Sequence, residues 1–261
     1  MNLPDVTREP KRKIARAIKL FGEAQRLLDS WSEANPNIAV MRPREDRRRI
    51  DFFLDTHGEP PLDEAALIIG DGIHNLRSAL DNMIWQLANA AGPTPNPKSI
   101  YFPVAETGKA WRAARTNLSS ISTEVLERVE HFQPFTVERM EETFLWNLHH
   151  LDIADKHRDY LVASPVLSES QMDHLLIGLD SGTELSFKNA DPRLVGLKNE
   201  LVMWIEFSKP FWADSPLTPT VQMETTFALH HGNGDVLLSL PAVFQSFPAR
   251  VTEIVDYVCG S

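Results

Sequence analysis

The chain has 261 residues, of which 26 are basic and 36 acidic, so its formal net charge is −10. An acidic balance of this size excludes a protein that coats nucleic acid through its overall charge, although a local basic surface stays open. The single cysteine, Cys259, excludes an internal disulfide and any zinc or iron–sulfur site built from several cysteines. No apolar run reaches the roughly 18 residues of a membrane span, so we expect a cytoplasmic protein without a membrane partner.

The basic residues are concentrated near the N-terminus, where residues 1–49 hold 12 of the 26 Lys and Arg but 7 of the 36 Asp and Glu. Three- and four-residue spacing of apolar side chains predicts a helix over 11–33. Two short extended segments, 38–41 and 50–54, are joined by a stretch with five arginines and predict a charged hairpin. Arg47 and Arg48 in this stretch are candidate contacts for RNA. The alternative is a solvated hairpin tip, partly neutralised by neighbouring acidic residues.

Further helices are predicted over 62–91, 108–116, 122–132 and 138–156, and the first of these is the longest uninterrupted helical pattern. From about residue 160 the apolar period changes from 3.6 to 2, which predicts antiparallel strands near 175–179, 185–187, 201–207, 221–229 and 236–240. An Asn-Gly turn at 233–234 joins the last two strands, and a closing helix follows over 241–258. The six tryptophans fall mostly at apolar positions and are expected in the core or in interfaces.

These patterns predict an α+β fold: a helical bundle with an N-terminal β-hairpin, followed by a C-terminal antiparallel β-meander and a closing helix. We divide the chain at residue 160, with the bundle and hairpin in 1–159 and the sheet and last helix in 160–261, packed as one unit. No phosphate loop or dinucleotide fingerprint is present, so we expect no ATP, NAD or other cofactor.

The central helix has a polar stripe opposite its apolar side. Solvated helix faces are usually rich in Lys and Glu, but neither residue occurs between positions 71 and 85. Short polar groups on every turn indicate a buried polar network or a site. In the alternative, the polar side chains of the stripe pair with one another without a ligand, for example through an i,i+4 ion pair between Arg77 and Asp81. The stripe consists of Asp71, His74, Asn75, Arg77, Ser78, Asp81 and Asn82.

A second polar cluster lies at the end of the predicted helix 138–156. Cationic side chains suit the carbonyl-rich end of a helix, which accounts for residues 156–158 without a site. The adjacent His149 and His150 have no such explanation. The candidate functional residues of this segment are His150, Asp155, His157 and Arg158.

The strings HNLRSALD (residues 74–81) and LDIADKHR (residues 151–158) resemble an uncharacterised family of actinobacterial and phage-borne proteins. A second resemblance is to the HEPN superfamily of helical bundles. Its ribonuclease members carry an arginine, a polar residue, and a histidine four to six positions after the arginine. Arg77 and Ser78 match the first half of this motif, whereas Asn82 stands where the histidine is expected.

The HEPN resemblance implies that Arg77 contacts the scissile phosphate and that a histidine exchanges a proton with the 2′-hydroxyl. Because Asn82 cannot titrate, His74, His150 or His157 would have to carry that proton. The resemblance also implies a homodimer, since HEPN-like sites are often shared across a two-fold interface.

We therefore interpret the chain as a HEPN-like protein that binds or cleaves RNA or a nucleotide phosphate through a polar groove between two helices. A ribonuclease of this kind would need no metal and would have an incomplete motif. Two alternatives remain: a non-enzymatic binding or assembly protein, and a metal-binding bundle using His/Asp pairs at i,i+3. The candidate catalytic residues are His74, Arg77, Asp81, His150 and His157, and the candidate binding residues are Asp71, Asn75, Asp155, Arg158, Arg47 and Arg48.

Overall fold

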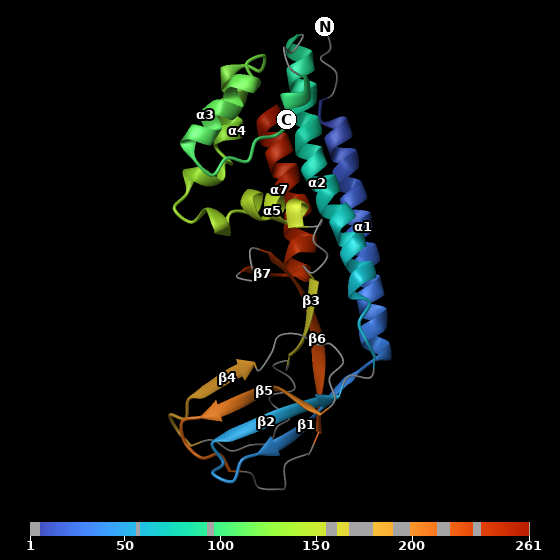
Figure 1. Ribbon diagram of the computed structural model, residues 1–261, viewed down its shortest axis with the longest axis vertical. Helices are drawn as coiled ribbons and strands as arrows, with labels where there is room; N and C mark the ends of the chain where they lie inside the picture. Colours follow the sequence, from blue (N-terminus) through green and yellow to red (C-terminus); the bar gives the residue numbers. More distant parts are fainter. Residues whose placement is uncertain are drawn as a thin grey trace. The chain divides into compact units, whose positions relative to one another are not determined.

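The computed structural model describes residues 6–55, 58–92, 97–154, 161–166, 180–189, 199–212, 220–231 and 236–260. It confirms the α+β class (Figure 1). The helices are α1 (Arg8–Ala34), α2 (Leu62–Ala91), α3 (Gly108–Asn117), α4 (Thr123–Glu130), α5 (Phe144–Ala154) and α7 (Leu240–Cys259). The strands are β1 (Asn37–Pro43), β2 (Arg49–Asp55), β3 (Leu161–Val166), β4 (Leu185–Asn189), β5 (Glu200–Phe207), β6 (Thr220–His231) and β7 (Val236–Ser239). Of the helices within these ranges, none is long and apolar enough to cross a membrane.

The chain forms two compact units and passes between them several times. The helical unit comprises Met1–Gln25, Asp63–Tyr160 and His230–Ser261, and the sheet unit comprises Arg26–Leu62 and Leu161–Leu229. This grouping differs from a division at residue 160. The hairpin β1–β2 belongs with the sheet because it hydrogen-bonds to β5 and β6, and α7 belongs with the helices because it packs against α1.

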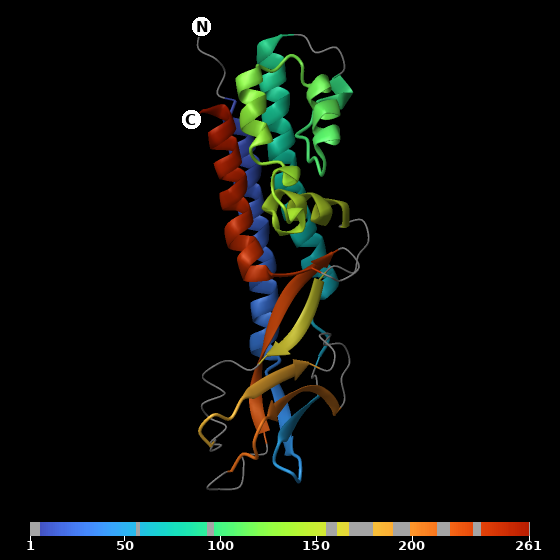
Figure 2. The same cartoon turned by 90° about the vertical axis from the view of Figure 1, so that its left-hand side faces the viewer.

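In the helical unit, α2 and α7 run beside the first part of α1 in both views (Figures 1 and 2). Phe21 of α1 stacks on Phe244 of α7, with ring centroids 4.8 Å apart. Gly72 of α2 lies against the same ring, and a Cβ at this position would stand 2.4 Å from a Phe21 carbon. The absence of a side chain at Gly72 therefore lets an aromatic ring fill the space between three helices.

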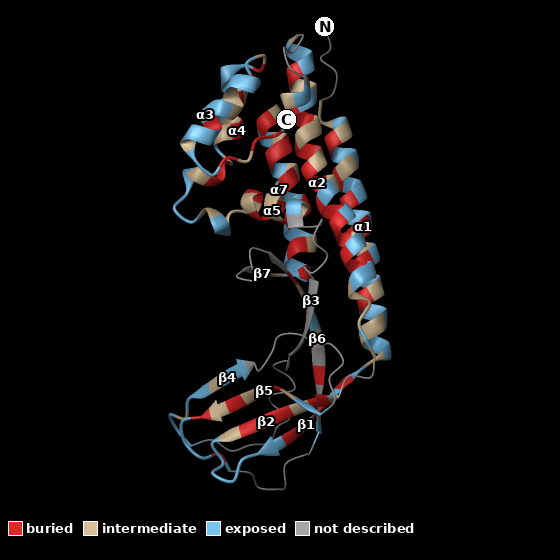
Figure 3. Cartoon of the chain, viewed as in Figure 1, coloured by how far each residue is buried: buried red, intermediate tan, exposed pale blue. Residues whose placement is uncertain are grey.

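The predicted apolar side of α2 is buried, and Figure 3 shows buried residues concentrated on α2 and α7. Only Leu87 of the predicted set is half-buried. Burying this stripe against the neighbouring helices stabilises α2 far more than helix propensity does. The fully buried or nearly fully buried members are Ile69, Ile73, Leu76, Leu80, Met83 and Ile84.

Helix α5 begins at Phe144 and not at Glu138 as predicted. Residues Met140–Glu142 form a separate 3-10 turn. Thr143 ends that turn and begins the helix, because its hydroxyl accepts a hydrogen bond from the Trp146 N–H at 3.4 Å and its carbonyl accepts one from the Asn147 N–H at 3.1 Å. The apolar spacing predicted one helix over 138–156 and did not reveal that Thr143 caps a shorter one.

The sheet is not the predicted meander. The strand order is β3-β6-β1-β2-β5-β4, with β7 paired to β6, so the N-terminal hairpin lies between two strands of the C-terminal half. Strand β3 was not among the predicted strands. It contains Pro165, which an end position in the strand order tolerates. The predicted strand near 175–179 and the Asn-Gly turn lie outside the described residues.

Candidate functional site

Histidine and carboxylate side chains from α2 and α5 meet within the helical unit. His74 of α2 places its Nδ1 atom 3.0 Å from Oδ1 of Asp152 on α5. The His74 side chain is 69% exposed and that of Asp152 is 22% exposed. The carboxylate therefore holds one nitrogen of an imidazole that is otherwise open to solvent.

Arg77 lies one turn further along α2, but it faces inward. Its Nη2 donates a hydrogen bond to the Phe102 carbonyl at 2.6 Å, and Nη1 makes an ionic contact with Asp81 Oδ1 at 2.9 Å. The same Asp81 oxygen accepts the Phe102 N–H at 2.8 Å. Arg77 and Asp81 thus hold both backbone groups of Phe102. The Arg77 side chain is 8% exposed, so the role of phosphate clamp expected for Arg77 does not fit its geometry.

A second imidazole–carboxylate pair joins α5 to the segment before α3. Oε1 of Glu106 accepts the indole N–H of Trp146 at 3.0 Å and lies 3.1 Å from Nε2 of His150. The Trp146 and His150 rings are 3.9 Å apart between centroids, which restricts the imidazole. Glu106 was not among the candidates, because it precedes α3 in a segment without any chemical motif. Only its position directly before the Thr107 N-cap of α3 marks it in the sequence.

Groups of both pairs, among them Asp152 and Glu106, act electrostatically on the imidazole of His149. Burial lowers its pKa below the usual 6.5, and the positive charges of Arg77 and His150 lower it further. Its Nδ1 atom is buried and has no hydrogen-bond partner among the residues that the structure describes. Burial also raises the pKa of Asp81 above 3.8, although Arg77 and the Phe102 N–H oppose this shift. We call the set His74, Arg77, Asp81, Glu106, His149, His150 and Asp152 the polar cluster.

Other candidates lie elsewhere. Asp71 is exposed, and its carbonyl accepts the side-chain amide of Asn75 at 2.7 Å, so these two satisfy each other within α2. Arg47 and Arg48 belong to the sheet unit. The remaining candidates, Asp155, His157 and Arg158, lie outside the described residues.

The metal alternative requires two His/Asp pairs on facing helices, Asp71/His74 and His149/Asp152. Of these residues, His74 and Asp152 meet across α2 and α5. In the described part of the chain, no three His, Cys, Asp or Glu side chains are grouped so that they could hold a metal ion.

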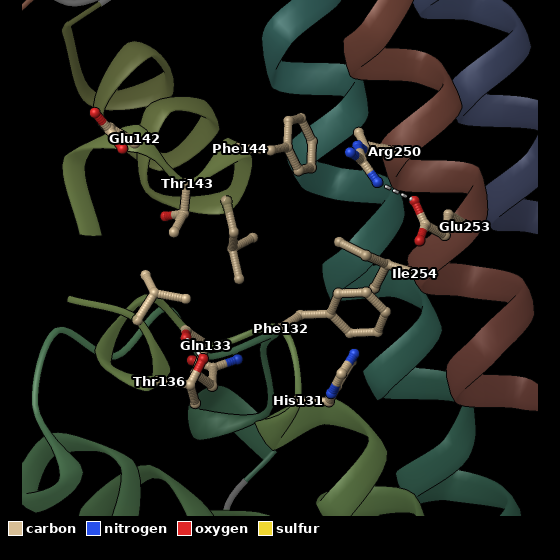
Figure 4. Close-up of a pocket in the computed structure, with 12 residues that line it drawn as sticks. His131, Phe132, Gln133, Thr136, Glu142, Thr143, Phe144, Arg250, Glu253 and Ile254 are labelled. Carbon is tan, nitrogen blue, oxygen red and sulfur yellow. Dashed lines mark hydrogen bonds and ion pairs between the residues drawn. The ribbon is translucent and has the colours of Figure 1, made fainter. Parts of the chain in front are cut away.

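A pocket of about 310 Å³ lies elsewhere in the helical unit, beside α7 and the segment that leads into α5 (Figure 4). Several of its polar side chains are engaged in contacts with protein groups. Arg250 donates to Glu253 at 2.7 Å, the Thr143 hydroxyl donates to the Met140 carbonyl, and Gln133 accepts the Ala105 N–H at 2.9 Å. No candidate residue from the sequence lines this pocket.

Comparison with known proteins adds no functional assignment: no protein-family model, curated protein or solved structure matches the chain. The function must therefore be argued from the geometry of its own side chains.

Proposed function

We propose that the chain cleaves RNA or a related nucleotide phosphodiester without a metal, using histidines of the polar cluster as proton carriers. The observation that carries the proposal is the presence of two imidazoles, His74 and His150, each held at one nitrogen by a carboxylate. A carboxylate at one ring nitrogen fixes the tautomer of the imidazole, and the mostly exposed ring of His74 keeps its other nitrogen open to solvent for proton exchange. In this proposal one imidazole acts as the general base and the other as the general acid.

The reaction requires one proton acceptor and one proton donor. A neutral imidazole takes the proton of the 2′-hydroxyl as the 2′-oxygen bonds to phosphorus. The bond from phosphorus to the 5′-oxygen breaks, and a protonated imidazole gives its proton to that oxygen. The products are a 2′,3′-cyclic phosphate and a free 5′-hydroxyl. Histidine populates both protonation states near neutral pH, which suits both tasks.

The resemblance to HEPN ribonucleases fits this proposal with two changes of role. His74, three positions before Arg77, would replace the histidine that is missing at Asn82. Arg77 would act as a positioning residue, because its guanidinium holds the Phe102 backbone and the segment that leads to Glu106. A homodimer that shares this site is part of the same proposal.

A second candidate function is a non-enzymatic binding or assembly protein in which the cluster only fixes the packing of α2, α5 and the segment between Phe102 and Glu106. The contacts of Arg77 and Asp81 with Phe102 favour it, because they join α2 to the segment at Phe102 without a ligand. The two functions differ in what they require of His74, whose ring is mostly exposed and adds little to packing.

The test is cleavage of a dinucleotide, uridylyl-adenosine, by the intact chain in EDTA. We expect His74→Gln and His150→Gln to lower kcat at least 100-fold with the melting temperature nearly unchanged. His131→Gln is the matched control, since His131 is an exposed histidine outside the polar cluster. Equal kcat in all four proteins, or no cleavage by the unaltered chain, would overturn the proposal and favour the non-enzymatic function.

A further inference from the structure

The tip of the hairpin β1–β2 presents two exposed arginines, Arg47 and Arg48, from a hydrogen-bonded backbone. The Arg47 and Arg48 carbonyls accept the N–H groups of Phe211 and Phe207, each at 2.9 Å. Arg47 has a φ of 51°, in the left-handed region that residues other than glycine rarely adopt. Both side chains are exposed and, within the described residues, form no ion pair. The backbone of the tip is therefore held to the strand and loop beside it, while both guanidinium groups remain exposed.

The outward face of the adjoining sheet carries flat side chains beside this tip. The Arg42 guanidinium carbon lies 4.1 Å from the centre of the Phe53 ring, and that of Arg49 lies 4.2 Å from the Trp204 ring. Arg42, Asp51 and Trp204 pair directly across β1, β2 and β5, so they share one face. The two stacks therefore lie on three neighbouring strands of a single surface.

Acidic groups on this face are arranged to hold the arginines and not to repel a polyanion. Asp51, 12% exposed, contacts both Arg49 and Arg44, the latter at 3.3 Å, and so orients the guanidinium planes. Glu206 accepts the indole N–H of Trp204 at 2.8 Å. Segment 42–51 as a whole has five arginines against three acidic residues, Glu45, Asp46 and Asp51.

Aromatic rings and guanidinium planes on an open sheet, with free cations alongside, match the chemistry of single-stranded RNA. Nucleobases stack on such planes, and phosphates pair with the cations. An anionic membrane or a simple polyanion would contact the cations but would not stack on the aromatic rings. The stacks thus distinguish a single strand with exposed bases from other polyanions.

We propose that the outward face of β1, β2 and β5 binds single-stranded RNA. Bases stack on the Arg42/Phe53 and Arg49/Trp204 pairs, and phosphates contact Arg47 and Arg48. The proposal rests on the proposed function for the choice of RNA, but it uses no residue of the polar cluster. It adds a separate binding surface within the sheet unit.

The test is binding of a fluorescein-labelled, 2′-O-methyl single strand of about 12 nucleotides to the intact chain. This strand cannot be cleaved through a 2′-hydroxyl, so affinity is measured apart from catalysis. The double variant Arg47→Gly and Arg48→Gln removes both cations. Glycine adopts a positive φ without strain, so folding is preserved. We expect Kd to rise at least tenfold and the slope of log Kd against log salt to fall by about 2.

Trp204→Leu and Phe53→Leu test the stacking surface. We expect each to raise Kd about tenfold and to leave the salt slope unchanged, because no phosphate contact is lost. Arg112→Gln is the matched control, an exposed arginine on α3 of the helical unit. Unchanged affinity in the tip variant would overturn the proposal. So would equal binding of heparin by the unaltered chain together with full RNA affinity in the Trp204 variant.

The two proposals fail separately. Loss of dinucleotide cleavage in His74→Gln with full affinity for the 12-nucleotide strand supports both. Strand binding by a chain that never cleaves the dinucleotide removes the proposed catalysis and leaves the binding surface. Cleavage of the dinucleotide by a chain whose tip variants bind the strand normally removes only the surface.

Discussion

Arg77 is a buried cation that is neutralised by groups of the protein itself and not by a ligand. Its guanidinium contacts the Phe102 carbonyl and the Asp81 carboxylate, and Asp81 completes the contact with the Phe102 N–H. Removing one partner from such a group leaves the others buried and unsatisfied, which costs more than the interaction itself contributes.

We expect Arg77→Ala to lower the free energy of unfolding by about 3 kcal/mol. Asp81→Asn should cost less than Asp81→Ala, because the amide oxygen still accepts the Phe102 N–H. Urea unfolding followed by circular dichroism measures both effects. A loss in Arg77→Ala no larger than in Arg112→Gln would contradict the contacts described.

His149 should make folding sensitive to acid. Its pKa is lowered by burial, so the unfolded chain binds a proton near the usual 6.5 while the folded chain does not. Stability from this group is therefore present above about pH 6.5 and is lost as the pH falls toward the folded-state pKa. The raised pKa of Asp81 acts in the opposite direction at pH values above 3.8.

We expect His149→Asn to flatten the dependence of the melting temperature on pH between pH 7.5 and 5, since the amide does not titrate. His131→Asn, at an exposed site, should keep the slope of the unaltered chain. The explanation fails if both variants show the same slope.

At the scale of elements, the packing of α1, α2 and α7 depends on a residue without a side chain. A methyl group at Gly72 would stand 2.4 Å from the Phe21 ring, which itself stacks on Phe244. Neither the ring nor the helices can move without disturbing this three-helix contact.

Gly72→Ala should therefore lower stability by about 1–3 kcal/mol, despite the higher helix propensity of alanine. Adding Phe21→Leu should recover part of the loss, because a smaller side chain leaves room for the methyl group. The double-mutant cycle, measured by urea unfolding, gives the coupling directly. Additive losses in the double variant would show that the two residues do not meet.

At the scale of the whole molecule, neither unit is a continuous stretch of chain. The helical unit is built from three segments and the sheet unit from two, with boundaries inside α1 and β6. A fragment of residues 1–159 would keep the hairpin but lose β5 and β6, and it would keep Phe21 but lose Phe244. Isolated hairpins are marginally stable in water.

We expect this fragment to lack a cooperative thermal transition, whereas the full chain unfolds cooperatively. Circular dichroism and an amide correlation spectrum of the fragment check this. A sharp transition with dispersed amide signals in residues 1–159 would show that the helices and hairpin need no later part of the chain.

Local patterns in the sequence determined most elements of this protein. Helix α2 runs over the predicted 62–91 because proline and glycine bound a continuous 3.6-residue period. The hairpin follows from two alternating segments around a charged tip. Each depends on neighbours within a few residues, which a sequence displays directly.

Only the tertiary structure decided which of these elements meet. His74 and Asp152 are 78 positions apart, and Glu106 reaches His150 from a segment without a motif. The inward position of Arg77 depends on Phe102, and the hairpin's place in the sheet depends on strands that begin more than a hundred residues later. Such contacts arise when burial of apolar surface brings distant segments together, and no local spacing encodes them.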